Sequence, residues 1–153
     1  MAKNFIYKYL SDNDMKSISG KIKEVEKRTS GELVVSIKRK RPMMQKKKPI
    51  SDLAVTEFNR IGMCKTADST GILLFILFED REFYILADKG INEKVDKNTW
   101  EEVKNNMQNY FVNGEYCKGI INSLEQMGNI LASHFPIKPG DVNEIADDVI
   151  VSE

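Results

Sequence analysis

The chain has 153 residues, of which 41% are hydrophobic and 30% charged, so it is long enough for one domain with a buried core and too apolar to be disordered. Its formal net charge is zero, which argues against a protein that binds nucleic acid through overall positive charge. No apolar run reaches the roughly 20 residues of a membrane span, and the N-terminus lacks a signal-peptide core, so we expect a cytoplasmic protein.

We expect three parts along the chain: an N-terminal segment over residues 1–11, an α/β domain over residues 12–135 and an acidic tail over residues 136–153. At the start of the domain, the polar residues Ser11 to Asp14 favour a helix start, and apolar side chains then recur at helical spacing. Gly31 is expected to end this helix in the left-handed conformation.

A β-strand pattern follows at Leu33–Ile37, and Ser51 is suited to cap a second helix. The most regular stretch of the chain comes next, because Gly71–Phe78 is apolar throughout after its glycine. A continuous apolar run bounded by turn residues is typical of a strand buried on both faces. The short turn Glu79-Asp80-Arg81 then predicts an antiparallel hairpin with a third strand at residues 82–86.

Two more helices are expected after the hairpin. Asp96 or Asn98 can begin the first of them, and Asn113-Gly114 is suited to end it. The second should run over about residues 115–133. The acidic tail that follows Pro136 shows no helical periodicity.

The order of these elements predicts the fold class. The first strand, the second helix and the second strand form a β–α–β unit, so the two strands should be parallel with a right-handed crossover. The hairpin adds an antiparallel strand. We therefore predict an α/β fold with a small three- or four-stranded mixed sheet and helices on both faces.

Acidic residues are expected to gather at one end of this sheet. Glu32 and Asp68 directly precede the first two strands, and the antiparallel third strand carries Asp88 back to the same end. Asp96 begins the next helix a few residues later. Because hard cations such as calcium prefer carboxylate oxygens, these residues predict a candidate metal site. The alternative is that the carboxylates cap turns and helices or are simply solvated.

A basic segment follows the first strand. Seven of the eleven residues in Lys38–Lys48 are basic and none is acidic. Because open α/β sheets often bind ligands at the carboxyl ends of their strands, this segment is a candidate site for RNA, phospholipid headgroups or a phosphorylated substrate. The alternative is a solvated loop whose charge the acidic tail balances. The candidate anion-binding residues are Lys38, Arg39, Lys40, Arg41, Lys46, Lys47 and Lys48.

The sequence shows no recognisable catalytic constellation. His134 is the only histidine and is expected to form a local hydrogen bond. Cys64 and Cys117 lack a metal-ligand spacing and are expected to be reduced thiols. Serine-, cysteine- and zinc-based mechanisms therefore have no support from the sequence.

Several short motifs follow one another in an order that resembles a known family. They are Thr29-Ser30-Gly31-Glu32, Ser69-Thr70-Gly71-Ile72-Leu73-Leu74, Ala87-Asp88-Lys89-Gly90-Ile91, Val95-Asp96 and Phe111-x-x-Gly114-Glu115-Tyr116-x-x-Gly119-Ile120. Together they cover about residues 12–133 and resemble the TPM domain family. That family includes thylakoid acid phosphatases, a photosystem II repair protein and an auxiliary subunit of nematode acetylcholine receptors.

The resemblance implies a Rossmann-like α/β/α domain, with calcium binding and phosphatase activity in some members. Bacterial members are often encoded near LemA-like membrane proteins, which implies a membrane-associated protein partner. Our leading hypothesis is a non-catalytic, calcium-binding interaction module that acts with such a partner. The alternatives are a metal-assisted phosphatase that hydrolyses phosphate monoesters, and anion or RNA binding through residues 38–48.

Overall fold

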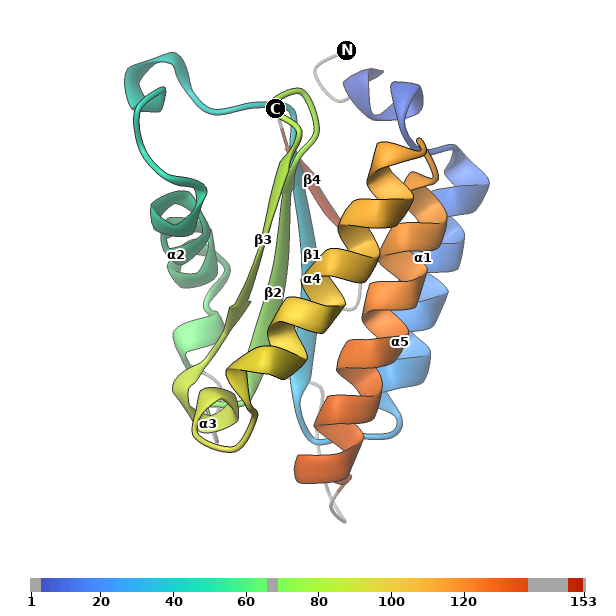
Figure 1. Cartoon of the computed structure of the whole chain (residues 1–153), viewed down its shortest axis with the longest axis vertical. Coiled ribbons are helices and arrows are strands. Elements are labelled where there is room, and N and C mark those ends of the chain that lie inside the picture. Colours follow the sequence, from blue (N-terminus) through green and yellow to red (C-terminus); the bar gives the residue numbers. More distant parts are fainter. Residues whose placement is uncertain (1–3, 66–68, 138–148, 153) are drawn as a thin grey trace.

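The computed structural model describes residues 4–65, 69–137 and 149–152. Its centre is a four-stranded sheet in which the strands lie in the order β3-β2-β1-β4 (Figure 1). β1 runs parallel to β2 and to β4, whereas β3 pairs antiparallel with β2. The strands are β1 (Glu32–Lys38), β2 (Gly71–Leu77), β3 (Glu82–Ala87) and β4 (Ile150–Ser152). The predicted α/β fold with a mixed sheet is confirmed.

β2 is the most deeply buried strand, because all seven of its residues are buried. Its side chains alternate between the two faces of the sheet, as strand geometry requires. Ile72, Leu74 and Ile76 belong to one hydrophobic cluster, and Leu73, Phe75 and Leu77 belong to the other. The uninterrupted apolar sequence of this strand therefore follows from its burial on both sides.

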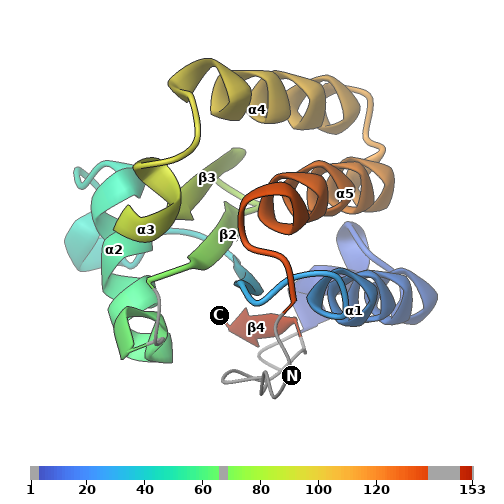
Figure 2. The same cartoon turned by 90° about the horizontal axis from the view of Figure 1, so that it is seen from below.

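Helices cover both faces of the sheet. α1, α4 and α5 form one layer, and α2 lies on the opposite face (Figure 1, Figure 2). A short helix, α3, connects the end of β3 to α4. The helices are α1 (Asp12–Glu26), α2 (Ile50–Ile61), α3 (Lys89–Asn92), α4 (Lys97–Val112) and α5 (Tyr116–His134).

Two predicted helix starts are confirmed and one is wrong. Ser11 caps α1 in a reciprocal capping box with Asp14, and the Asp96 side chain accepts a hydrogen bond from the backbone of α4. α2, however, begins at Ile50 rather than after Ser51. Pro49 precedes it with an extended ψ of 151°, and the Pro49 carbonyl accepts the first helical hydrogen bond, from Asp52 N at 3.1 Å.

The expected left-handed conformation of Gly31 is also wrong. Among the described glycines, positive φ values occur at Gly62 and Gly114. Gly31 instead permits a close approach, because a Cβ atom there would lie 2.9 Å from Leu131 Cδ2 and 3.1 Å from the Thr70 carbonyl oxygen. The glycine therefore lets α5 and the start of β2 come together beside β1.

The sequence pattern of the tail did not indicate β4. This strand has three residues and pairs in parallel with the end of β1, where Ser36 lies opposite Ile150. A strand of this length carries too little alternation to be recognised in a sequence. Its presence makes β1 an inner strand and leaves β3 as an outer strand of the sheet.

The contact between α4 and α5 predicts opposite effects for two helical Gly→Ala substitutions. A Cβ atom at Gly119 would lie 2.9 Å from Tyr110 Cβ, whereas nothing lies within 4 Å of one at Gly20. We expect Gly20→Ala to raise the free energy of unfolding by about 1 kcal/mol through helix propensity, and Gly119→Ala to lower it by about 1–3 kcal/mol through overpacking. Urea denaturation measures both values, and equal stabilisation by the two substitutions would contradict the close crossing.

Candidate functional site

The acidic residues predicted to share one end of the sheet do so in part. Glu32 begins β1 directly beside Gly71, the first residue of β2. The Gly71 carbonyl oxygen accepts a hydrogen bond of 2.9 Å from the Asp88 backbone, which brings the end of β3 to the same place. Glu32 is buried and Asp88 is half-buried. Asp68 lies outside the described residues.

The carboxylates of Asp88 and Asp96 both cap helices. Asp88 accepts a hydrogen bond of 2.8 Å from the Lys89 backbone, and Asp96 accepts one of 3.0 Å from the Asn98 backbone. These contacts support the capping alternative for the two residues. Within the described parts of the chain, no three His, Cys, Asp or Glu side chains are grouped so that they could hold a metal ion. The calcium site therefore stays a prediction.

The basic segment, residues 38–48, lies at the opposite end of the sheet and is called the basic loop below. It leaves β1 beside the turn between β2 and β3, as the expected topology requires (Figure 1). The Glu79 backbone donates a hydrogen bond of 2.8 Å to the Arg39 carbonyl oxygen, and the Arg39 side chain forms an ion pair with Glu79. The start of the loop is therefore fixed to the hairpin.

Arg41 holds the two ends of the basic loop together. Its guanidinium group binds Asp80 at 3.2 Å and Glu82 at 3.0 Å, and its Nε donates a hydrogen bond of 2.8 Å to the Lys48 carbonyl oxygen. The hydrogen bond to Glu82 raises the pKa of Arg41 above its usual value, so the side chain stays charged. This predicted anion-binding residue has an internal structural role instead.

The lysines of the basic loop are the residues available to a ligand. Lys38 is half-buried at the end of β1, whereas Lys40, Lys46, Lys47 and Lys48 are exposed. Of the seven cations predicted to bind anions, two arginines therefore bind the hairpin and four lysines face solvent. Anion binding by these lysines stays a prediction.

Two methionines at the tip of the basic loop were not among the predicted site residues. Met43 is 76% exposed and Met44 is 97% exposed, in a short 3₁₀ helix at Met43–Gln45. Methionine is usually a core residue, so this exposure of adjacent side chains is unusual. The signal in the sequence was an apolar pair inside a segment that carries no other hydrophobic residue between Lys38 and Lys48.

Glu57 of α2 is a buried carboxylate, as many catalytic acids and bases are, but its contacts differ from theirs. The Ser36 hydroxyl donates a hydrogen bond to Glu57, and Arg60 binds it through Nε at 2.7 Å. Burial raises the pKa of Glu57, but these hydrogen bonds outweigh burial and hold the pKa below its usual value. Glu57 therefore joins α2 to β1 as a paired structural carboxylate.

The contacts of Arg41 predict that it stabilises the fold more than Arg39 does. The Arg41 side chain is 13% exposed, against 38% for Arg39. We expect Arg41→Ala to lower the free energy of unfolding by about 1–3 kcal/mol, because it removes charge-assisted hydrogen bonds to partly buried groups. Arg39→Ala should lower it by less than about 1 kcal/mol. Denaturant titration checks both, and a larger loss for Arg39→Ala would contradict the assignment.

Comparisons with known proteins agree with this architecture. The family model described as TPM domain matches residues 7–130. The chain is similar to the BA42 protein from the psychrophilic bacterium Bizionia argentinensis, with 30% sequence identity, a TM-score of 0.84 and coverage of 94% of this chain and 96% of that chain. It shares the fold of the N-terminal domain of a protein from P. gingivalis, with 15% identity, a TM-score of 0.68 and coverage of 85% and 83%.

A comparison with curated proteins gave no match. Among the helices of the described residues, none has the length and apolar character of a membrane span. The match of the family model extends over most of the chain and confirms the resemblance seen in the motifs. The chain belongs to the TPM domain family.

Proposed function

We propose that this chain is a non-catalytic interaction module that docks on an anionic membrane surface beside a membrane-associated protein partner. The basic loop is the docking element. The observation that carries the proposal is the exposure of Met43 and Met44 one residue before the three exposed lysines Lys46, Lys47 and Lys48. Apolar side chains next to cations are the combination that binds the interface of an anionic bilayer.

The two residue types contribute in different ways. Each lysine near an anionic bilayer contributes roughly 1 kcal/mol of electrostatic attraction. A methionine that moves from water into the acyl boundary contributes up to about 1.5–3 kcal/mol. Neither contribution alone gives firm binding, but the sum is in the range of reversible membrane association.

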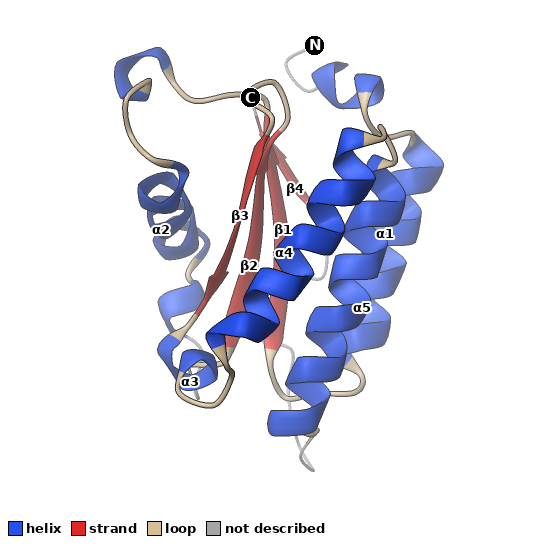
Figure 3. Cartoon of the chain, viewed as in Figure 1, coloured by secondary structure: helices blue, strands red, loops and turns tan. Residues whose placement is uncertain are grey.

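Other exposed apolar residues lie at the same end of the molecule. Tyr7 belongs to the 3₁₀ helix at Asn4–Lys8, and Val112 is the last residue of α4; both are exposed. The 3₁₀ helix, the C-terminal end of α4 and the basic loop lie at the end of the fold at which β1 and β2 finish (Figure 3). Of the six exposed large hydrophobic residues in the described chain, four therefore lie at this end.

Arg41 supports the proposal because it orders the basic loop in advance. Its contacts with Asp80, Glu82 and the Lys48 carbonyl fix both ends of the loop to the hairpin. A loop that is already ordered loses less conformational entropy when it binds. The lysines and methionines project from this fixed base.

The proposal predicts binding to acidic vesicles that depends on both residue types. The wild-type chain should sediment with vesicles of phosphatidylcholine and phosphatidylserine but not with phosphatidylcholine alone. Replacing Lys46, Lys47 and Lys48 together by Gln should weaken binding by about 100-fold, at roughly 1 kcal/mol per lysine. The double variant Met43→Ser/Met44→Ser should also bind more weakly and should become more sensitive to salt.

The matched control replaces three exposed lysines by Gln, Lys16 and Lys23 of α1 and Lys27 at its C-terminal cap, and changes the net charge equally. This control should bind the acidic vesicles almost as well as the wild type. Equal loss in the two triple variants would mean that net charge rather than the loop drives binding. Tighter binding to single-stranded RNA than to acidic vesicles would reject the membrane in favour of the RNA alternative.

A second candidate function, a calcium-dependent phosphatase for phosphate monoesters, is favoured by one observation. Glu32, a buried carboxylate, begins β1, and Asp88 directly follows β3, so the two residues lie at the same end of the sheet. A cation held there would polarise a phosphoryl oxygen and lower the pKa of an attacking water molecule. Asp96 and Asp68 complete the predicted ligand set.

This candidate is tested by substitutions that keep the helix caps. Asn caps helices about as well as Asp, so Asp88→Asn and Asp96→Asn should change the unfolding free energy by less than about 1 kcal/mol. If the metal site exists, millimolar calcium raises the melting temperature of the wild type and of neither variant. The phosphatase also requires that wild type hydrolyses p-nitrophenyl phosphate faster than Asp96→Asn, and equal rates would reject it.

A further inference from the structure

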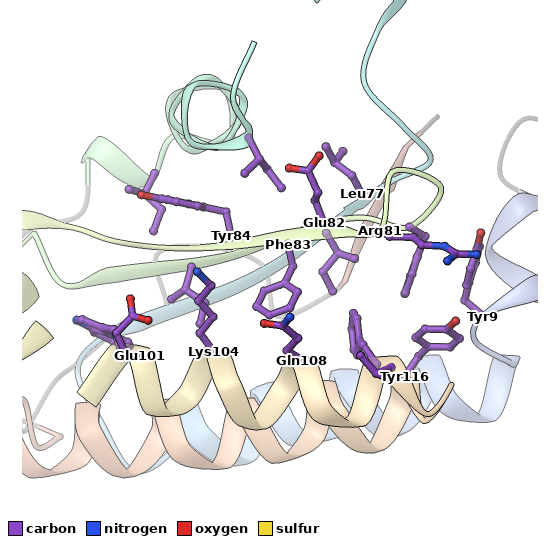
Figure 4. Close-up of a pocket in the computed structure, with 18 of the residues that line it drawn as sticks. Tyr9, Leu77, Arg81, Glu82, Phe83, Tyr84, Glu101, Lys104, Gln108 and Tyr116 are labelled. Carbon is purple, nitrogen blue, oxygen red and sulfur yellow. The ribbon is translucent and has the colours of Figure 1, made fainter. Parts of the chain in front are cut away.

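A groove runs along the outer edge of the sheet and starts beside the base of the basic loop. It has a volume of about 1390 Å³ and follows β3 over its whole length. α4 forms one wall, and the α4–α5 junction closes one end, where Tyr9, Arg81 and Tyr116 lie together (Figure 4). Glu101 lies toward the other end (Figure 4).

The backbone of β3 offers hydrogen-bonding groups to this groove that have no partner among the described residues. β3 is an outer strand of the sheet. The hydrogen bond from Asp88 N to the Gly71 carbonyl shows which residues of β3 are hydrogen-bonded to β2. Because bonded residues alternate in an antiparallel pair, the peptide groups of Phe83 and Ile85 point away from β2. The outward carbonyl of Ala87 already accepts a hydrogen bond of 2.8 Å from Asn92.

The sequence of β3 does not protect this edge. Outer strands of natural sheets are usually blocked by lysine, proline, a bulge or a covering segment. The strand Glu82–Ala87 reads EFYILA and contains neither lysine nor proline. It pairs with β2 in a continuous register without a bulge, and α2 and α4 flank it on opposite faces (Figure 2).

The side chains along the groove determine which kinds of residue an added strand could place there. Phe83 projects toward α4 and Tyr84 toward α2 (Figure 4), so an added strand would meet aromatic side chains on both faces. The indole Nε1 of Trp100, in the α4 wall, is buried and has no hydrogen-bond partner among the described residues. A carbonyl or carboxylate oxygen from a bound segment would satisfy this donor.

The charges of the groove favour an acidic occupant. Arg81, Lys97 and Lys104 line it, and they form no salt bridge within the described chain. Three acidic residues also line it, but Glu79 is paired with Arg39 and Glu82 with Arg41, which leaves Glu101 against three cations.

We propose that the open edge of β3 binds an extended acidic segment of a partner protein as an additional β-strand. Main-chain hydrogen bonds to Phe83 and Ile85 would give affinity, and the aromatic and cationic side chains would give selectivity. The edge lies inside a groove, which suits a single strand better than the sheet of a second copy, whose own α2 and α4 would flank its edge. This site is separate from the basic loop.

The test uses two variants that remove the same side chain but differ in the backbone. Ile85→Pro removes the outward N–H and is compatible with an outer strand, whereas Ile85→Ala keeps that N–H. The probe is a peptide of alternating glutamate and valine, six residues long like β3, and its lysine–valine counterpart. Binding is followed by the backbone amide shifts of the isotope-labelled full chain at up to millimolar peptide.

We expect the acidic peptide to shift the amides of β3 and the Trp100 indole N–H. The Ile85→Pro chain should bind about tenfold more weakly than Ile85→Ala, which corresponds to one main-chain hydrogen bond. Lys104→Glu should weaken binding more than Lys118→Glu, which changes the net charge equally outside the groove. The chain with Lys46, Lys47 and Lys48 replaced by Gln should bind the peptide like the wild type, which separates this result from the test of the basic loop.

Three results would overturn the proposal. The first is the absence of shifts in β3 at millimolar acidic peptide. The second is a failure of either comparison: Ile85→Pro and Ile85→Ala bind the acidic peptide with equal affinity, or the wild type binds the lysine–valine peptide as tightly as the glutamate–valine peptide. The third is a concentration-dependent shift of the β3 amides without peptide, because a second copy of the chain would then be the occupant.

Discussion

Burial of β2 on both faces is the constraint on which the rest of the structure depends. The six residues that follow Gly71 in β2 contribute alternately to the two hydrophobic clusters, so α2 must lie on one side of the sheet and α1, α4 and α5 on the other. The parallel partner β1 and the antiparallel partner β3 then place each connecting segment at a fixed end of the sheet. Acidic residues consequently gather where β1 and β2 begin, and the basic loop emerges where they finish.

The end that carries the basic loop is rigid behind its exposed surface. Tyr9 stacks on Phe78 with ring centroids 4.3 Å apart, and Phe111 and Tyr116 pack around the same ring. This aromatic cluster joins the N-terminal segment, the end of β2 and the α4–α5 junction. Because Arg41 binds the hairpin, the exposed lysines and methionines project from a segment whose ends are fixed. The open edge of β3 starts beside this segment. The two proposed recognition surfaces thereby belong to one small domain.

The parts of the fold that depend on local patterns were predictable, and those that depend on tertiary contacts were not. The apolar run of β2, the hairpin and the cap at Asp96 were readable from the sequence. The role of Gly31 is set by Leu131, a residue far along the chain, so local glycine rules gave the wrong conformation. Composition located the basic loop, but it could not show that Arg41 binds the hairpin while Met44 is exposed. The groove along β3 depends on how α2 and α4 pack beside this outer strand, which local sequence patterns do not show.

Residue-level contact with a bilayer is the sharpest test of docking through the basic loop. A lipid spin label at the headgroup level of acidic bicelles broadens the amide resonances of residues that reach the interface, and an isotope-labelled chain reports each one. If the basic loop docks on the membrane, broadening is strongest at Met43 and Met44 and weaker across Lys46–Lys48. No broadening is expected at the opposite end of the sheet, around Glu32 and Asp88. Broadening centred on that acidic end, or uniform broadening along the chain, would contradict docking through the basic loop.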